Sequence, residues 1–412
     1  MSRRVVVTGM GGLSPIGREW KEVRDALAAG RSGVQRVDAW DDVEDFGTRL
    51  AAPVAFETPE HWPRKKRRAM GRVSALAASA SERALDDAGL LGDPLLGGGR
   101  VGVSFGSSSG SPPAMGVYAE KLFQGRTLRG IGANEYLQIM SHTCAANIAN
   151  LFGLRGRVVS TCTACTSASQ GIGFAYEMLA AGAQDVMLAG GAEELHPMVV
   201  AVFDILFSAS TRNDEPEATP RPFDAARDGL VVGEGAGCLV LEELAHARRR
   251  GARIYAEIIG FGTNGDGRHM TNPDPAGMEA VLRLALEDAK LAPSEVGYVN
   301  AHGTATDVGD VAESQATYEV FGGDVPVSSL KGNLGHTLGA CGALEAWMTL
   351  CMMRDEWFAP TCNLEVVDER CAALDFIIHE PRALVTDVVM SNNFAFGGVN
   401  TSLIFRRAPD LV

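Results

Sequence analysis

The sequence predicts an α/β fold built from layers of strands and helices. Two observations support this prediction. Short runs of β-branched and other apolar residues recur along the 412-residue chain, and glycine-rich turns bound many of them. Between these runs lie alanine-rich stretches whose apolar residues follow the helical spacing of three and four. With 46% hydrophobic residues, a chain of this length can bury a large core.

The elements of the first half each have a local reason. The run Val5–Thr8 predicts a short buried strand that ends in a glycine turn at 9–12. The pattern at Val73–Ala88 predicts a helix that Gly89 terminates. The elements expected next are the strands Val101–Phe105 and Val158–Ser160, the helix Gly171–Ala181 and the strand Val186–Ala189.

The second half repeats this order. Its expected elements are the strand Ile254–Gly260, the helix Glu279–Leu291, the strands Val296–Asn300 and Val327–Ser329, the helix Ala343–Met353 and the strand Val388–Ser391. Two helices share a motif, which reads ALDDA at 84–88 and ALEDA at 285–289. We therefore expect an internal duplication, with halves at 1–250 and 251–412 packed as one body and insertions near 106–155 and 192–240.

Composition excludes several classes of protein. The net charge of −14 argues against general binding to nucleic acid. No stretch reaches the roughly 18 uninterrupted apolar residues of a membrane span, so we expect no membrane insertion. The eight cysteines are too sparse for a disulfide framework, which favours reduced thiols in a cytoplasmic protein. One basic run, RKKRR at 64–68, stands out against the acidic background.

The segment TCTAC at 161–165 leaves three alternatives for Cys162 and Cys165. A structural zinc site needs about four ligands, usually in two close pairs, and no second pair occurs, so we expect no metal. A thioredoxin-like redox pair belongs to a much smaller βαβ context. In the third alternative, Cys165 lies at a strand-to-helix turn where the helix dipole stabilises a thiolate nucleophile, while Cys162 only packs.

A cysteine nucleophile needs partners that handle charge and protons. His302 and His336 lie in glycine-flanked turns directly after strands of the second half, and this shared setting favours a functional role for both. The other histidines lack this setting and are expected to be structural or peripheral. Lys331 and Glu345 bracket the second turn, and we expect an ion pair between them to hold its shape.

Two glycine-rich segments suggest different ligands. In NNFAFGGVN at 392–400, a glycine pair after an aromatic residue allows a backbone N–H to point into a site, as the oxyanion hole of a thioester requires. The segment GMGGLS at 9–14 is similar to a dinucleotide-binding fingerprint. Its sixth position is Ser14 and no helical pattern follows directly, so we expect no nicotinamide cofactor.

Several ordered motifs together resemble one family, the elongating β-ketoacyl-acyl carrier protein synthases, from Val5 to Phe405. The motifs are TACTS at 163–167, PFD at 222–224 with RDG at 227–229, GEGA at 233–236, NAHGTAT at 300–306, Lys331 with GH at 335–336, and FAFGGVN at 394–400. The resemblance implies the thiolase fold, a duplicated five-layer αβαβα body, and decarboxylative Claisen condensation of an acyl primer with malonyl-acyl carrier protein. It implies no cofactor of the enzyme's own, because phosphopantetheine arrives on the carrier.

The resemblance also implies a role for each site residue. Cys165 resembles the nucleophile that accepts the acyl chain, with the backbone N–H groups of Cys165 and Phe396 as the oxyanion hole. His302 and His336 resemble the pair that promotes decarboxylation, supported by Lys331 and Glu345. Phe396 also resembles a gate that opens after acylation. The residues implied to contact substrate are Thr271, Thr304, Thr306, Phe394 and Ser109.

The partners and the pathway are less closely defined. Acyl carrier proteins are acidic, so we expect Arg64, Lys65, Arg67 and Arg68 to dock the carrier rather than form a merely solvated loop. The departures from the family pattern at Leu334, Val399 and Ser109 leave a fatty-acid, polyene or polyketide product open. We expect a homodimer, or a heterodimer with a ketosynthase-like chain-length subunit. The alternatives are a coenzyme A-dependent thiolase, which would carry a late Cys-Gly turn, and a non-catalytic chain-length subunit, which would lack Cys165.

Overall fold

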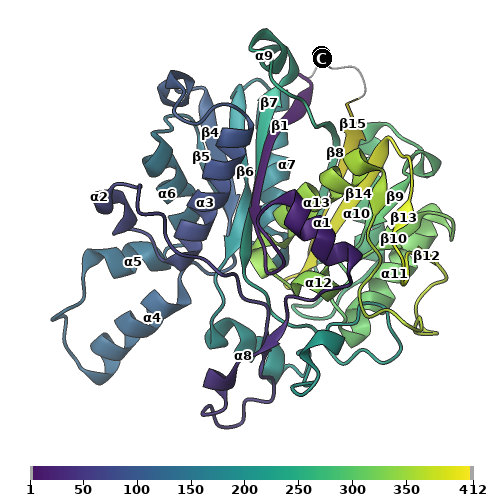
Figure 1. The fold of residues 1–412 in the computed structure, drawn as a ribbon, viewed down its shortest axis with the longest axis horizontal. Helices are drawn as coiled ribbons and strands as arrows, with labels where there is room; N and C mark the ends of the chain where they lie inside the picture. Colours follow the sequence, from purple (N-terminus) through teal and green to yellow (C-terminus); the bar gives the residue numbers. More distant parts are fainter. Residues whose placement is uncertain (1–2, 409–412) are drawn as a thin grey trace.

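A computed structural model describes residues 3–408, and an 11-stranded sheet runs through the molecule (Figure 1). From one edge to the other, its strands are β12 (Asp375–Phe376), β10 (Pro326–Ser328), β9 (Tyr298–Asn300), β14 (Val388–Ala395), β15 (Val399–Arg407), β8 (Ala256–Gly265), β1 (Val5–Leu13), β7 (Gly235–Glu243), β6 (Val186–Glu193), β4 (Val101–Gly106) and β5 (Val158–Thr161).

The strand order is symmetric about β1 and β8, which are antiparallel neighbours. Their paired region is short and joins Val5–Val7 to Ala256–Ile258. On each side, an antiparallel neighbour comes next, β7 or β15, followed by strands that run parallel to one another. This repeated order is what an internal duplication produces. The boundary between residues 250 and 251 stays a prediction.

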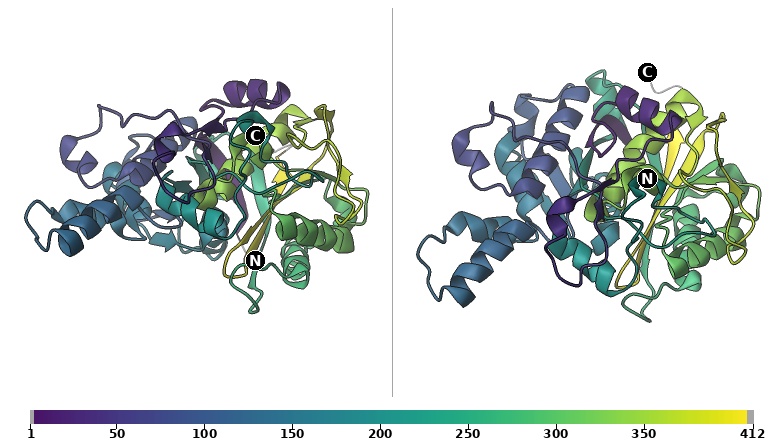
Figure 2. Two further views of the ribbon diagram at one scale, coloured as in Figure 1. Left: turned by 90° about the horizontal axis from the view of Figure 1, so that it is seen from below. Right: turned by 60° about the horizontal axis from the view of Figure 1, so that its bottom comes forward.

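Helices form three layers around the two halves of the sheet. One outer layer contains α3 (Arg72–Asp87) and α6 (Thr143–Phe152), and the other contains α10 (Pro275–Ala289) and α11 (Asp307–Phe321). Between them, α7 (Ser167–Ala180) and α13 (Cys341–Asp355) contact strands of both halves. Figures 1 and 2 show the two halves side by side, with the first half in purple to teal and the second in green to yellow. The predicted αβαβα layering is confirmed.

The remaining elements are shorter. They are α1 (Trp20–Ala28), α2 (Arg64–Arg67), α4 (Pro112–Ala119), α5 (Ala133–Ile139), α8 (Pro197–Ile205), α9 (Leu244–Arg249), α12 (Lys331–Leu334), β2 (Gln35–Arg36), β3 (Leu50–Ala51), β11 (Trp357–Phe358) and β13 (Arg382–Ala383). The insertion that contains α4 and α5 projects from the body of the molecule (Figure 1). No helix within residues 3–408 combines the length and the apolar character needed to cross a bilayer.

The predicted glycine turn at 9–12 is wrong, because β1 continues through it to Leu13. The glycines serve close packing instead. A Cβ atom on Gly9 would come within 2.3 Å of the Ala84 carbonyl oxygen on α3, and one on Gly11 within 2.6 Å of the Ala80 oxygen. Glycine therefore lets the helix lie directly against the strand. Strand β8 likewise continues to Gly265, beyond the expected end of that strand at Gly260.

Several elements were not predicted, among them β7, β15 and α11. Strand β7 occupies the end of the expected insertion at 192–240, so β6 does not close the first half. Strand β15 forms a hairpin with β14, and α11 follows the His302 loop. The prediction assumed that strands and helices alternate, and this assumption misses antiparallel strands that are neighbours in the sheet. The other predicted strands and helices are present, with shifted ends.

Candidate active site

A sharp turn carries Cys165 from β5 into the central helix α7. Ala164 adopts a left-handed backbone conformation with φ 49°, and a short 3-10 turn spans Ala164–Thr166 before α7 begins at Ser167. This conformation is unfavourable for a residue with a Cβ atom and is retained where the surrounding structure imposes it. It places the Cys165 side chain at the N-terminal end of a 14-residue helix, where it is buried.

The expected stabilisation of a thiolate by the helix end does not dominate. Burial raises the pKa of Cys165 to about 12, although the Lys331 charge and the backbone N–H groups of Cys165 and Phe396 each act to lower it. The desolvation of a buried anion therefore outweighs the favourable dipoles. Cys165 rests as a thiol, and two backbone N–H groups are directed at its sulfur.

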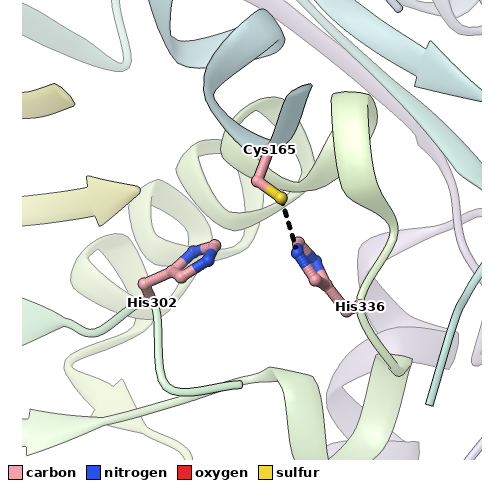
Figure 3. A group of neighbouring side chains, drawn as sticks. All are labelled: Cys165, His302 and His336. Carbon is pink, nitrogen blue, oxygen red and sulfur yellow. Dashed lines mark hydrogen bonds between the residues drawn. The ribbon is translucent and has the colours of Figure 1, made fainter. Parts of the chain in front are cut away.

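Both predicted histidines lie beside this thiol. His336 follows α12, and its Nε2 atom is 3.0 Å from Cys165 Sγ (Figure 3). His302 follows β9, and its ring lies nearly perpendicular to that of His336, with centroids 5.1 Å apart. The loops after β5, β9 and α12 thus meet at one point, so the three residues come together as the sequence predicts. The expectation that His336 directly follows a strand is wrong, because α12 separates it from β10.

Hydrogen bonds behind the rings define their tautomers. The Leu338 N–H donates to Nδ1 of His336 at 3.3 Å, and the Asn393 amide nitrogen donates to Nδ1 of His302 at 3.4 Å. Burial, with a contribution from the Lys331 charge, holds the pKa of each histidine well below its ordinary value. Each ring is therefore neutral and carries its proton on Nε2, from which it can donate into the site.

Lys331 and Glu345 form the predicted ion pair, and both side chains are buried. Burial acts to lower the pKa of Lys331, but Glu345 and other nearby acidic groups raise it overall, so the lysine stays charged. Glu345 also accepts a hydrogen bond from the Asn393 amide at 2.7 Å. The Lys331–Glu345 pair thus positions Asn393, whose amide contacts His302.

Two buried carboxyl groups that the sequence did not indicate hold the loops of the site. Glu313 accepts from the backbone N–H groups of His302 at 2.6 Å and Gly303 at 2.7 Å, and burial raises its pKa to about 8. Glu193 accepts through one oxygen from the N–H groups of Ser108 at 3.0 Å and Gly339 at 2.9 Å. Its pKa is raised to about 7 by burial. Glu313 lies on a helix that was not predicted, and no local motif distinguishes Glu193.

A cavity of about 100 Å³ opens onto the three residues. Of the residues expected to contact substrate or line its path, those along the cavity are Thr271, Thr304, Thr306, Phe394 and Phe396. Ser109 is not part of this lining; it lies in the loop after β4, and its hydroxyl is buried without a partner. The half-buried ring of Phe396 packs against Phe203 on α8, with centroids 5.4 Å apart.

The turn between β14 and β15 closes one side of this cavity. Gly397 and Gly398 have φ of 87° and 68°, a conformation that favours glycine. The Gly397 N–H donates to the Met270 carbonyl oxygen at 2.7 Å, which ties the turn to the loop that contains Thr271.

Cys162 is not a partner of Cys165. Its thiol is exposed and donates to the Ser108 carbonyl oxygen at 3.3 Å. Within the part of the chain that the structure describes, the one group of candidate metal-binding side chains that lie close together consists of Cys165, His302 and His336.

The basic run forms α2 and its end. Arg64, Lys65 and Arg68 are exposed, and no ion pair involves them among residues 3–408. Lys66 instead donates to the backbone oxygens of Asn150 and Leu151 at the end of α6. The exposed members are therefore available to a partner, whereas Lys66 anchors the segment.

Comparison with known proteins identifies the family. The chain matches the model of the β-ketoacyl synthase N-terminal domain over residues 2–247 and that of the C-terminal domain over residues 255–365. It is 40% identical, over 99% of both chains, to 3-oxoacyl-[acyl-carrier-protein] synthase 2 of Coxiella burnetii. A crystal structure of a β-ketoacyl synthase from Burkholderia phymatum is 58% identical and superposes with a TM-score of 0.97 over 98% of this chain and 100% of that chain. A complex of a ketosynthase with its chain length factor from Xenorhabdus doucetiae provides a chain that is 26% identical, with a TM-score of 0.85 over 98% of each chain. Together with the geometry of the site, these matches show that the chain belongs to the β-ketoacyl synthase family of acyltransferases.

Proposed function

We propose that this enzyme condenses an acyl group held on Cys165 with a malonyl group delivered by acyl carrier protein. The observation that supports this most strongly is the arrangement of one buried thiol with two neutral imidazoles that both donate from Nε2. Such a site can form a thioester and then stabilise a negative oxygen through two N–H donors.

The first step is acyl transfer. The Cys165 sulfur attacks the carbonyl carbon of the acyl thioester on the carrier, and its proton goes to the departing phosphopantetheine thiol. Negative charge develops on the carbonyl oxygen. The N–H groups of Cys165 and Phe396, already directed at the sulfur, are close enough to receive that oxygen. Phosphopantetheine arrives with the carrier, so the enzyme supplies no cofactor of its own.

The second step is condensation. The malonyl thioester enters the cavity with its carbonyl oxygen between the Nε2–H groups of His302 and His336, and loss of CO₂ leaves an enolate. The enolate carbon attacks the carbonyl of the acyl-cysteine and a carbon–carbon bond forms. The Cys165 sulfur leaves as a thiolate and takes up a proton from solvent, which restores the resting thiol. Thr271, Thr304 and Thr306 offer hydroxyls to the pantetheine arm, and Phe396 gates the acyl side of the cavity.

The carrier docks on the basic run, and a second subunit completes the enzyme. The exposed Arg64, Lys65 and Arg68 suit an acidic partner, and Arg67 adds charge beside them. Strand β5 ends the sheet and pairs with β4 alone among the described strands, with Val158 48% exposed. An open edge of this kind supports a dimer, either with a second copy or with a chain-length subunit. The free cysteines fit a cytoplasmic setting.

Mass spectrometry of the acyl group trapped on Cys165 tests the proposal. The enzyme is incubated with a panel of acyl-carriers of different length and saturation, and then with malonyl-carrier. We expect an acyl adduct on the Cys165 peptide that disappears, with CO₂ release, when malonyl-carrier is added. Acylation from acyl-coenzyme A but from no carrier would favour the thiolase alternative, and no acylation at all would favour a non-catalytic chain-length subunit. The preferred acyl group distinguishes a fatty-acid substrate from a polyene or polyketide substrate.

A further inference from the structure

The sulfur and the two imidazoles of the site are close enough to hold a metal ion. One ligand atom from each of Cys165, His302 and His336 lies within 4.8 Å of the other two, and all three residues are buried. A thiolate with two imidazoles is a donor set that Zn²⁺ prefers, at about 2.3 Å from sulfur and about 2.0–2.1 Å from nitrogen. A bound zinc ion would occupy the sulfur electron pair that the nucleophile needs. The site therefore requires a means of refusing such ions.

The hydrogen bonds behind the rings provide this means. A neutral imidazole that binds a metal through Nε2 carries its proton on Nδ1 and donates that proton to an acceptor. Here both Nδ1 atoms face donors, the Leu338 N–H at His336 and the Asn393 amide at His302. Moving either ring proton to Nδ1 would bring two N–H groups against each other in a buried position. The metal-binding tautomer is thus opposed at both rings.

We propose that the Leu338 N–H and the Asn393 side chain keep the Cys165 centre free of zinc-like metal ions by holding both histidines in the Nε2–H tautomer. Asn393 cannot simply turn its amide over. Its nitrogen also donates to the Glu345 carboxylate at 2.7 Å, and a turned amide would place its oxygen against that carboxylate. Asn393 is therefore a positioning residue that acts through His302.

The charge near the site acts in the same direction. The Lys331 ammonium affects the titration of Cys165, His302 and His336 alike, so its positive charge lies near all three ligand atoms. A bound metal dication would lie near this ammonium, and the repulsion between the two positive charges is poorly screened in a buried site. Burial also opposes the loss of the thiol proton that metal binding requires. The inference does not depend on which acyl group the enzyme uses.

Cobalt titration provides the test. Co²⁺ bound to a cysteine thiolate gives a charge-transfer absorption in the near ultraviolet, so Co²⁺ is the probe. The wild-type enzyme is compared with Asn393→Asp, whose carboxylate can accept a proton from Nδ1 of His302, and with Asn393→Leu, which removes the donor and adds no acceptor. We expect no band from the wild type. We expect Asn393→Asp to bind at least about tenfold more tightly than Asn393→Leu, with the band lost when Cys165→Ala is added.

A tight stoichiometric band in the wild type would overturn the proposal, as would equal Co²⁺ binding by all three proteins. A direct measurement keeps it testable even where Asn393→Asp does not fold. In wild-type enzyme labelled with ¹⁵N-histidine, the nitrogen chemical shifts report which ring nitrogen carries the proton. We expect Nε2–H at both His302 and His336, and an Nδ1 proton on either ring would contradict the proposal. In Asn393→Asp the His302 proton should move to Nδ1, which separates a tautomer effect from a simple gain of negative charge.

Discussion

Cys162 and Cys165 share one turn but have different surroundings. The Cys162 thiol is exposed and donates to the Ser108 carbonyl oxygen at 3.3 Å, whereas the buried Cys165 thiol lies 3.0 Å from Nε2 of His336. A redox pair would require the two sulfurs to contact each other. The two cysteines are therefore expected to respond differently to substitution.

Replacing Cys165 by Ala should abolish acyl transfer, because the attacking sulfur is lost, while Cys162→Ser should keep most of the activity. The measurement is transfer of a radiolabelled acyl group from the carrier to the enzyme. Iodoacetamide labelling with peptide mapping is the companion experiment. If activity is lost in step with modification of Cys162, the assignment of the nucleophile is wrong.

Replacing His302 or His336 by Ala should separate the two half-reactions. Either variant should still accept an acyl chain on Cys165, since the oxyanion donors of that step are backbone groups. Decarboxylation of malonyl-carrier should slow by roughly 10²–10³-fold, the usual effect of removing one donor to a developing oxyanion. Release of ¹⁴CO₂ is the measurement. Parent rates of release from both variants would contradict the proposed enolate roles.

Reversing charge on α2 should weaken carrier binding without harming the chemistry. In Lys65→Glu with Arg68→Glu, KM for acyl-carrier should rise severalfold, and the dependence of KM on salt should flatten, because salt screens charged contacts over about 10 Å at 0.1 M and about 3 Å at 1 M. Turnover of a small pantetheine thioester should not change. Lys66→Gln is the matched comparison, since Lys66 contacts α6 instead. An equal loss with both substrates would assign Lys65 and Arg68 a role in folding.

The contribution of Glu193 to stability should fall as the pH rises from about 4.5 to about 7. Its folded pKa of about 7 lies above the ordinary value of about 4.3. Between these values the folded state holds a proton that the unfolded state has released. The free energy of unfolding therefore falls by up to about 1.4 kcal/mol for each pH unit. Glu193→Gln should flatten the pH dependence of the urea unfolding midpoint. Glutamine can preserve the local structure because one oxygen accepts both backbone N–H groups. An unchanged slope in this variant would show that Glu193 does not titrate in this range.

The sequence predicts the three reactive side chains because each lies in a turn after a predicted strand, next to small residues. Cys165, His302 and His336 are brought together as expected. Local patterns also predict helices such as α3, whose apolar spacing and terminal glycine are visible in the sequence. These features depend on residues that are close in the chain.

The features that the sequence does not reveal depend on contacts between distant segments. In the motif that contains Asn393, the sequence draws attention to the glycines. The role of Asn393 depends instead on its hydrogen bonds to His302 and Glu345, which are distant in the chain. The glycines of β1 read as a turn because their packing partner, α3, is far away in sequence. The resting protonation state of Cys165 depends on burial, which a helix-end argument does not include.

The two central helices begin in the same way. Ala164 at φ 49° leads the turn Ala164–Thr166 into α7, and Leu338 at φ 45° leads the turn Leu338–Ala340 into α13. In the first turn the middle residue is Cys165, whereas in the second it is Gly339, where a Cβ atom would come within 2.7 Å of the Ser108 nitrogen. The scaffold thus offers two equivalent places for a nucleophile but has room for a side chain at one. Each polypeptide should therefore be loaded with a single acyl equivalent, so the stoichiometry of acylation is one per chain and not one per repeat.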